Sequence, residues 1–317
     1  MDHITQHTPP LELRPLGGTG IFVSPIGLGT VKLGRNQGVK YPHPFALPTD
    51  EQVRALLARA ADVGVNLIDT APAYGTSEER LGELLSGERW FGSRMRWVIS
   101  SKAGEEFEQG VSRFDFSAGA IRASVLRSLR RLRTDYLDVV LIHSSGDDSA
   151  ILADGQAVSE LCSLKREGKI RAIGMSTKTV EGGLLALGVK AQPHIADTSV
   201  VRHGRWCDVL MVSLNQSDAS QLPVIREAAR AGAGILIKKA FESGHVASQS
   251  HGNHAATTID ERLPQAAMTD ADPIRRALAF VFDQGGDAVS SVVGGTVNPD
   301  HLENNVQVVT ELQRQKR

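Results

Sequence analysis

The sequence is poor in cysteine and in net charge of either sign. Its two cysteines, Cys162 and Cys207, stand far apart and match no metal-ligand or redox spacing, so we expect no disulfide framework and a reducing, cytoplasmic environment. A formal net charge of -1 over 317 residues gives no overall attraction to nucleic acid or to an anionic membrane surface. Any phosphate binding must therefore be local, and we expect neither nucleic acid nor a membrane as a partner.

Long apolar runs are absent too. No run reaches the roughly 18 residues of a membrane-spanning helix, and the first ten residues lack the basic region followed by an apolar region that marks a secretory signal. With 41% hydrophobic and 22% charged residues, the composition is that of a globular protein that can bury a full core. We expect a polar tail over residues 1–10, followed by one large α/β domain over residues 11–317.

Short apolar runs alternate regularly with amphipathic segments along this domain. Residues 11–13 and 20–23, which flank Gly17-Gly18-Thr19, predict an N-terminal β-hairpin. Strands are then predicted at 26–29, 65–70, 96–101, 136–142, 170–175, 208–214, 235–237 and 288–293. Helices are predicted at 50–63, 77–85, 121–132, 158–166, 180–187, 224–231, 273–282 and 302–309. Eight such strand-and-helix units predict an α/β fold, a closed (β/α)8 TIM barrel.

A dinucleotide-binding Rossmann fold is the main competing architecture, because Gly27 and Gly29 follow an apolar run. Position 32 is Lys32, however, and a long loop rich in Gly, Pro and Asn follows in place of a helix, so this fold is rejected. Residues 188–206 are irregular and rich in His and Arg. Residues 242–270 show little periodicity, and a loop of this length in a compact domain is a candidate lid.

Titratable residues follow three consecutive predicted strands of the barrel. Asp69 and Tyr74 lie at and beyond the end of the second, Lys102 follows the third, and His143 follows the fourth. In a (β/α)8 barrel the carboxyl ends of the strands form one rim, so these side chains are expected to converge. Taken singly, each has an ordinary explanation: Asp69 as a turn residue, Lys102 as a lysine that reaches water, His143 as a hydrogen-bonded core residue. The combination favours an active site.

The chemistry of this set is specific. A buried Lys102 needs a counter-charge, which Asp69 can provide. The resulting cation is expected to lower the pKa of Tyr74 from about 10, so that the phenol gives a proton near neutral pH and takes it back in reverse. His143 can hydrogen-bond a substrate oxygen. No nucleophile and base pair and no metal-ligand cluster is evident, so the set suits proton transfer to a carbonyl that accepts hydride from a cofactor.

Several motifs in order resemble the aldo-keto reductase family: residues 16–30 (LGGTGIFVSPIGLGT), 69–75 (DTAPAYG), Ser101-Lys102, 141–143 (LIH) and 174–176 (GMS). The resemblance spans nearly the whole chain. It implies a (β/α)8 barrel that binds NADP(H) in preference to NAD(H) and interconverts a small aldehyde or ketone with its alcohol. It also implies a catalytic tetrad with a tyrosine as acid/base, matched here by Asp69, Tyr74, Lys102 and His143.

The cofactor contacts that the resemblance implies match in part. The matching or neighbouring positions are Gly29, Thr30, Asp69, Ser176, Lys239, Ser243, Thr296 and Asn305. Departures from the family pattern are Thr177 for an asparagine, Met211 for a glutamine, Lys238 for an aromatic ring, and Gly295 and His301 for basic residues. Because histidine is a weaker phosphate partner than arginine, the preference for NADP(H) rests on the family and not on His301.

Two other functions stay open. The altered nicotinamide contacts also fit a cofactor-binding regulatory or sensor protein with little turnover. Lys102 also fits a barrel lyase or hydrolase that uses it for a Schiff base or for electrostatic stabilisation, which needs no nicotinamide. No motif of the chain identifies the substrate, because the walls of such a site are formed by loops. No motif indicates the oligomeric state.

Overall fold

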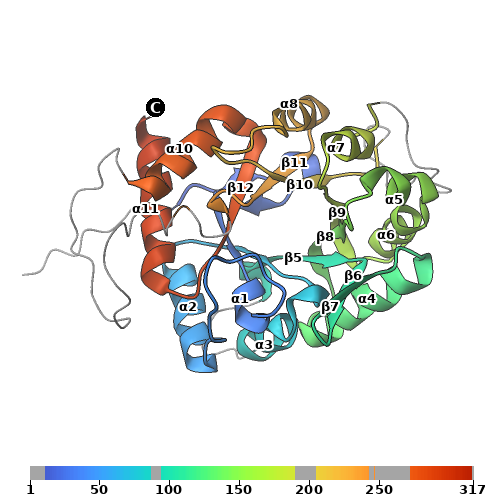
Figure 1. Ribbon diagram of the computed structural model, residues 1–317, viewed down its shortest axis with the longest axis horizontal. Helices are drawn as coiled ribbons and strands as arrows, with labels where there is room; N and C mark the ends of the chain where they lie inside the picture. The colour runs from blue at the N-terminus through green and yellow to red at the C-terminus, as the bar shows by residue number, and fades with distance from the viewer. Residues whose placement is uncertain (1–10, 87–93, 190–204, 243–245, 247–271, 316–317) are drawn as a thin grey trace, which may run out of the picture.

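A closed barrel of eight parallel strands, surrounded by helices, forms the body of the computed structural model (Figure 1), which describes residues 11–86, 94–189, 205–242, 246 and 272–315. The (β/α)8 architecture predicted from the sequence is confirmed. The strand order is β10-β11-β12-β3-β4-β5-β8-β9. Each barrel strand therefore pairs with the barrel strands before and after it in the chain, and β12 closes the barrel on β3.

The elements follow the predicted alternation. The barrel strands are β3 Ile26–Gly29, β4 Leu67–Asp69, β5 Val98–Ala103, β8 Leu137–His143, β9 Ile170–Ser176, β10 Val209–Ser213, β11 Gly234–Lys238 and β12 Val289–Gly295. The helices around them are α2 Asp50–Asp62, α3 Ser77–Leu85, α4 Ala118–Arg131, α6 Gln156–Arg166, α7 Val180–Ala186, α8 Leu222–Ala231, α10 Pro273–Gly285 and α11 Pro299–Gln315. Shorter helical segments are α1 Val31–Gly34, α5 Asp148–Asp154 and the 3-10 turns η1 Gly17–Thr19, η2 Pro72–Tyr74, η3 Arg94–Arg96 and η5 Gly286–Ala288.

Helix α2 shows how local sequence sets the limits of an element. Thr49 Oγ1 accepts a hydrogen bond from the Gln52 amide, and Gln52 Oε1 accepts one from the Thr49 amide, so two backbone donors at the helix start are satisfied. Just beyond the helix end, Gly64 has a φ of +82°, a conformation that costs glycine little. The apolar face predicted from the sequence is buried along the whole helix.

Two apolar layers make up the core. The larger layer lies between the strands and the helices, and the smaller fills the barrel interior with inward side chains such as Leu67 and Leu141. Side chains alternate along a strand, so residues two or four positions further toward the carboxyl end also point inward. Above the apolar layer, these inward positions are Asp69, Lys102, His143, Ser176 and Lys238.

The N-terminal hairpin differs from its prediction in position. Its strands are β1 Arg14–Pro15 and β2 Phe22–Val23, so residues 11–13 precede the hairpin instead of forming its first strand. Leu11 joins the outer core, which draws this segment away from strand pairing.

A second hairpin, β6 Glu105–Glu108 and β7 Val111–Phe114, lies between β5 and α4 and was not expected from the sequence. Its turn is made by Gln109 and Gly110, both with positive φ. The strands carry charged residues and none of their residues is fully buried, so they lack the apolar alternation that reveals a strand. In Figure 1 this hairpin lies beside the barrel strands β5 and β8.

Almost all of the candidate lid over residues 242–270, most of the irregular segment 188–206 and the polar tail over residues 1–10 lie outside the described residues. None of the described helices combines the length and apolar character needed to cross a bilayer.

Candidate active site

The four predicted catalytic residues lie together at the carboxyl ends of the barrel strands. Asp69 ends β4, Lys102 lies near the end of β5, His143 ends β8, and Tyr74 ends the turn η2 that follows β4. Lys102 Nζ lies 2.7 Å from Asp69 Oδ2 and 4.8 Å from the centroid of the Tyr74 ring. The rings of Tyr74 and His143 meet edge to face, with their centroids 6.2 Å apart.

Lys102 and Asp69 form the buried ion pair expected from the sequence. Their side chains are only 1% and 4% exposed. Lys102 Nζ also donates to the Thr70 carbonyl at 2.9 Å, and Ser100 Oγ donates to Asp69 Oδ1 at 3.1 Å. Burial alone would lower the pKa of Lys102, but the Asp69 carboxylate and the Tyr74 phenol raise it above its ordinary value. The amine therefore stays a cation.

Tyr74 departs from the expected titration. Burial raises the pKa of its phenol above 10, and the lowering effect of Lys102 does not outweigh burial. The reason is that Asp69 partly neutralises the Lys102 charge and itself raises the pKa of the phenol. The prediction of a lowered pKa is therefore wrong, and the Tyr74 phenol is neutral at neutral pH.

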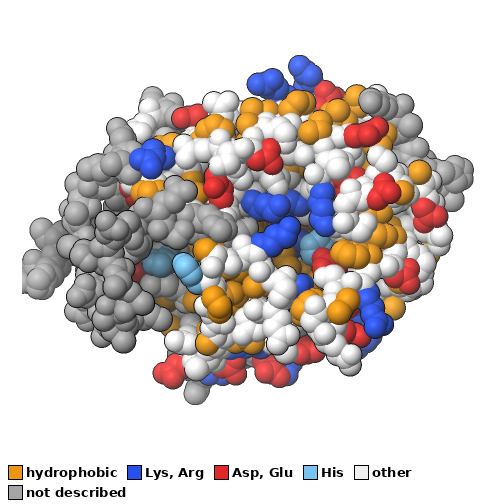
Figure 2. Space-filling model, viewed as in Figure 1, with side chains coloured by type: hydrophobic (Ala, Val, Ile, Leu, Met, Phe, Trp, Pro, Cys, Tyr) orange, Lys and Arg blue, Asp and Glu red, His pale blue; other side chains and the backbone are white. Residues whose placement is uncertain are grey.

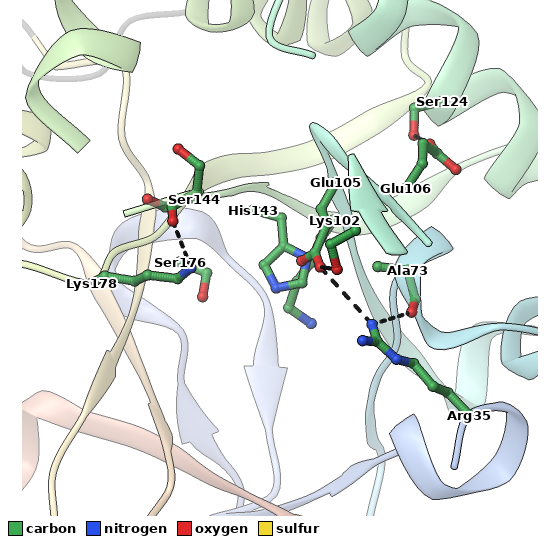
Figure 3. Close-up of polar contacts among 12 residues, drawn as sticks. Arg35, Ala73, Lys102, Glu105, Glu106, Ser124, His143, Ser144, Ser176 and Lys178 are labelled. Atoms are coloured by element: carbon green, nitrogen blue, oxygen red, sulfur yellow. Dashed lines mark hydrogen bonds and ion pairs between the residues drawn. The ribbon is translucent and has the colours of Figure 1, made fainter. Parts of the chain in front are cut away.

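His143 has a carboxylate neighbour that sequence reasoning missed. Its Nδ1 lies 2.9 Å from Glu105 Oε2, a distance typical of a hydrogen bond, although the two groups are not aligned as in one (Figure 3). Burial works to raise the pKa of Glu105, but His143, Ser112 and Arg35 together lower it to about 2. For His143 itself, burial lowers the pKa and Glu105 opposes that effect.

Arg35 ties three loops of the rim together. Its Nη1 donates to the Ala73 carbonyl at 3.0 Å, which fixes the residue before Tyr74. The same guanidinium lies 3.9 Å from Glu105 and 3.4 Å from the centroid of the Phe107 ring. It therefore links the loop after α1, the turn η2 and the hairpin β6–β7. A signal for Glu105 was present in the chain, since it stands three residues beyond Lys102 and past the glycine that follows β5.

Lys238 occupies the centre of the predicted cofactor contacts. Its Nζ donates to Ser176 Oγ and to the Thr177 carbonyl, both at 2.8 Å. Thr177 Oγ1 is buried and has no hydrogen-bond partner among the described residues. Met211 lies lower in the barrel, inside the apolar interior layer. Burial, with Lys239 and other nearby lysines, lowers the pKa of Lys238 to about 7.

The remaining predicted cofactor positions surround the same rim. Gly29 and Gly295 are paired in register on β3 and β12. Thr30 Oγ1 is buried and donates to the Asp69 carbonyl. Thr296 Oγ1 accepts from the Asn298 amide, just before α11. On α11, His301 is exposed and Asn305 is buried, Lys239 is exposed beyond β11, and Ser243 lies outside the described residues.

Positive charge is in surplus at this rim, and Figure 2 shows Lys and Arg side chains gathered near the middle of the visible face. The Asp69 and Glu105 carboxylates already have partners. Within the described part of the chain, no carboxylate lies within 4 Å of a Lys178 or Lys238 amine. The described residues also contain no group of three or more His, Cys, Asp and Glu placed to hold a metal ion. An anion is thus the charge that this rim can accept.

In chemical terms, the cluster holds a neutral phenol, a buried ammonium and an imidazole around one point. Such a set can give a proton to an oxygen atom and stabilise the phenolate that remains. Cys162 and Cys207 are both buried, so neither offers a thiolate nucleophile to a substrate.

Comparison with known proteins agrees with this geometry. The sequence model of the Aldo/keto reductase family matches residues 25–196, which is more than half of the chain. A solved structure from Pseudomonas aeruginosa, described as that of an aldo-keto reductase, is 44% identical, covers 98% of this chain and 99% of its own, and superposes with a TM-score of 0.74. L-galactose dehydrogenase of Arabidopsis thaliana is 28% identical over 96% of this chain and 89% of its own length. The NADH-specific methylglyoxal reductase of Escherichia coli is 34% identical over 50% of each chain.

These similarities agree with one another across the barrel and its rim. Four of the five motifs that carry the family resemblance lie at the carboxyl ends of the barrel strands, where the described ionisable side chains converge. The fifth, residues 16–30, begins in the N-terminal hairpin and reaches this rim only at its end. The chain belongs to the aldo/keto reductase family, and its relatives are oxidoreductases.

Proposed function

We propose that the protein is a nicotinamide-dependent oxidoreductase that interconverts a small aldehyde or ketone with its alcohol, with Tyr74 passing the proton. The observation that carries this proposal is the contact between the buried Lys102–Asp69 ion pair and a Tyr74 phenol that burial keeps neutral. A neutral phenol beside a fixed cation can give up its proton without separating charge in a dry site.

Each residue of the cluster then has a distinct task. In the reducing direction Tyr74 donates its proton to the oxygen of the carbonyl group, and Lys102 stabilises the phenolate left behind. Asp69 keeps Lys102 in place and charged. His143 lies at the edge of the phenol ring, where it can hydrogen-bond the oxygen of the substrate. In the oxidising direction the phenolate takes the proton of the alcohol back.

The rim offers suitable partners for a nicotinamide cofactor, which when bound supplies or accepts the hydride. Thr177 Oγ1 is buried and has no partner among the described residues, and Ser176, the preceding residue, presents a hydroxyl that accepts from Lys238. These two hydroxyls would hold the carboxamide, and the amines of Lys238 and Lys239 would face negative charge on the cofactor. We propose NADP(H) in preference to NAD(H), on the support of this surplus of positive charge.

A Schiff-base lyase or hydrolase is a weaker proposal. Its nucleophile would have to be the neutral amine of Lys102. The ion pair with Asp69 and the raised pKa keep this amine protonated, which removes its nucleophilicity.

The test follows the reduced cofactor at 340 nm: its formation from the oxidised cofactor with small sugars, and its loss with 2-oxoaldehydes, the substrate classes named for the two relatives above. Wild type should turn over at least one of them, and Tyr74→Phe, which retains the ring, should lose activity by about 10²- to 10⁴-fold. Equal rates for the two proteins on every substrate would exclude this mechanism. Titration with NADPH and NADH, followed by fluorescence, checks the cofactor proposal separately.

A further inference from the structure

Glu105 is a carboxylate at the rim with no part in the proton transfer proposed above. It comes from β6, outside the barrel, and reaches Nδ1 of His143 with its Oε2 at 2.9 Å. Both side chains are largely enclosed, with 12% and 17% exposed. Figure 3 shows Glu105 between His143 and Arg35. Nδ1 is itself buried, so Nε2 is the ring nitrogen left for a ligand.

Two further contacts hold this carboxylate in place. Ser112 Oγ, on the paired strand β7, donates to Glu105 Oε1 at 2.6 Å. The Arg35 guanidinium lies 3.9 Å away and is itself anchored on the Ala73 carbonyl. With these partners Glu105 is ionised in the neutral pH range, and an ionised carboxylate can only accept hydrogen bonds.

A nitrogen held this close to an acceptor-only group is favourable when it carries a proton, and unfavourable when it presents a lone pair. We propose that Glu105 is a positioning residue that keeps the proton of neutral His143 on Nδ1, so that Nε2 faces the substrate as an acceptor. The effect on substrate binding rests on the proposed function, but the tautomer itself is a property of the protein without substrate or cofactor.

The consequence concerns which substrate His143 can hydrogen-bond. In the neutral ring with Nδ1 protonated, Nε2 accepts from the hydroxyl of an alcohol. In the imidazolium, Nε2 carries a proton and donates to the oxygen of a carbonyl. The groups that act on the charge of the ring are Glu105, Lys102 and Lys238, in addition to burial. At neutral and alkaline pH the neutral His143 ring can therefore hydrogen-bond the alcohol, and at acidic pH the imidazolium can hydrogen-bond the carbonyl.

The test is ¹⁵N NMR of histidine-labelled full chain without cofactor. The chain has 10 histidines, and the signal of His143 is identified by its loss in His143→Gln. At pH 8 the wild type should show Nδ1 protonated and Nε2 unprotonated. Glu105→Leu, which removes every acceptor, should lose this form as the dominant one. Glu105→Gln, which keeps one acceptor oxygen, should retain it.

Glu106→Gln is the matched control. Glu106 is the next residue on β6, but its carboxylate accepts from Ser124 Oγ at 2.9 Å and pairs with Arg127, away from His143 (Figure 3). Its variant should keep the wild-type tautomer. A wild-type protein with Nε2 protonated at pH 8 would overturn the proposal, and so would a tautomer unchanged in Glu105→Leu. If Glu105→Leu does not fold, the wild-type spectrum still tests the proposal, because a proton on Nε2 at pH 8 would contradict it.

Kinetics separate positioning from a general structural role. For an alcohol at pH 8, Glu105→Leu should raise KM roughly 10-fold, while the affinity for cofactor stays as in wild type. Equal losses in alcohol and cofactor affinity would show damage to the whole rim and contradict positioning. Because the NMR measurement needs no turnover, a protein without reductase activity would refute the proposed function and leave the tautomer test intact.

Discussion

Lys238 Nζ donates a hydrogen bond to Ser176 Oγ across 2.8 Å, which joins the rim ends of β11 and β9 through a cation. The same amine donates to the Thr177 carbonyl. No carboxylate of the described chain lies within 4 Å of it. Burial, and then the charges of Lys239 and Lys102, lower the pKa of Lys238 to about 7. The folded protein thus holds the proton of this amine more weakly than the unfolded chain does.

Stability should therefore depend on pH through Lys238. Between pH 7 and about 10.5 the unfolded chain binds more protons at this residue than the folded protein, so wild-type stability should gain from rising pH. Lys238→Met lacks this group, and its free energy of unfolding relative to wild type should fall from pH 7 to pH 9.5. Urea unfolding at both pH values measures the difference. Lys239→Met, which removes one of the charges that lower this pKa, should keep only part of the wild-type gain. A constant difference for Lys238→Met would contradict the prediction.

Asp69 should be essential for stability as well as for activity. Asp69→Asn leaves the Lys102 ammonium buried without its counter-charge, which should cost about 3–5 kcal/mol of the free energy of unfolding. The double variant Asp69→Asn with Lys102→Met removes the stranded charge and should recover most of that loss, without recovering activity. Denaturant unfolding of the three proteins checks this. If Asp69→Asn unfolds at the wild-type denaturant concentration, the ion pair does not stabilise the fold.

The barrel could be predicted because its elements are encoded locally. Apolar runs of strand length alternate with helical stripes, and the structure has a strand at each of the eight predicted places. The Asp69–Lys102 pair could also be predicted, since a buried amine at the end of β5 requires a counter-charge and the preceding barrel strand ends in one. Both inferences use periodicity and neighbouring strands alone.

The features that were not predicted depend on distant segments. Glu105 reaches His143 only because residues 105–114 fold into a hairpin, and the strands of this hairpin have no apolar alternation. The direction of the pKa shift of Tyr74 depends on how completely the surrounding loops bury the phenol. The contact of Lys238 with Ser176 joins residues 62 positions apart. None of these quantities can be read from the spacing of residues.

Glu105 should contribute stability that disappears in acid. Its pKa is about 2 in the folded protein, below the ordinary value of 4.5, so the contribution is complete above pH 4.5 and is lost as the pH falls toward 2. Glu105→Gln should lower the free energy of unfolding at pH 7 by about 1–3 kcal/mol, because partial exposure screens the charge interactions, and the difference should shrink as the pH falls toward 2. Urea titrations from pH 7 down to pH 3 would record this convergence. A difference that stays constant over this range would mean that the charge of Glu105 does not stabilise the fold.

Asp138 should matter for stability alone, because it lies at the amino end of β8, opposite His143. Its side chain is 1% exposed and accepts hydrogen bonds from the Ile99 amide, Arg94 and Arg171. Asp138→Ala leaves the buried Ile99 amide without its acceptor and removes the ion pairs with Arg94 and Arg171, which should cost about 1–3 kcal/mol. The folded fraction should keep the wild-type kcat, since carboxyl-end residues of a barrel carry the chemistry and amino-end residues carry stability. Denaturant unfolding measures the loss of stability, and kcat is measured well below the unfolding temperature. A reduced kcat at wild-type stability would place Asp138 in the active site.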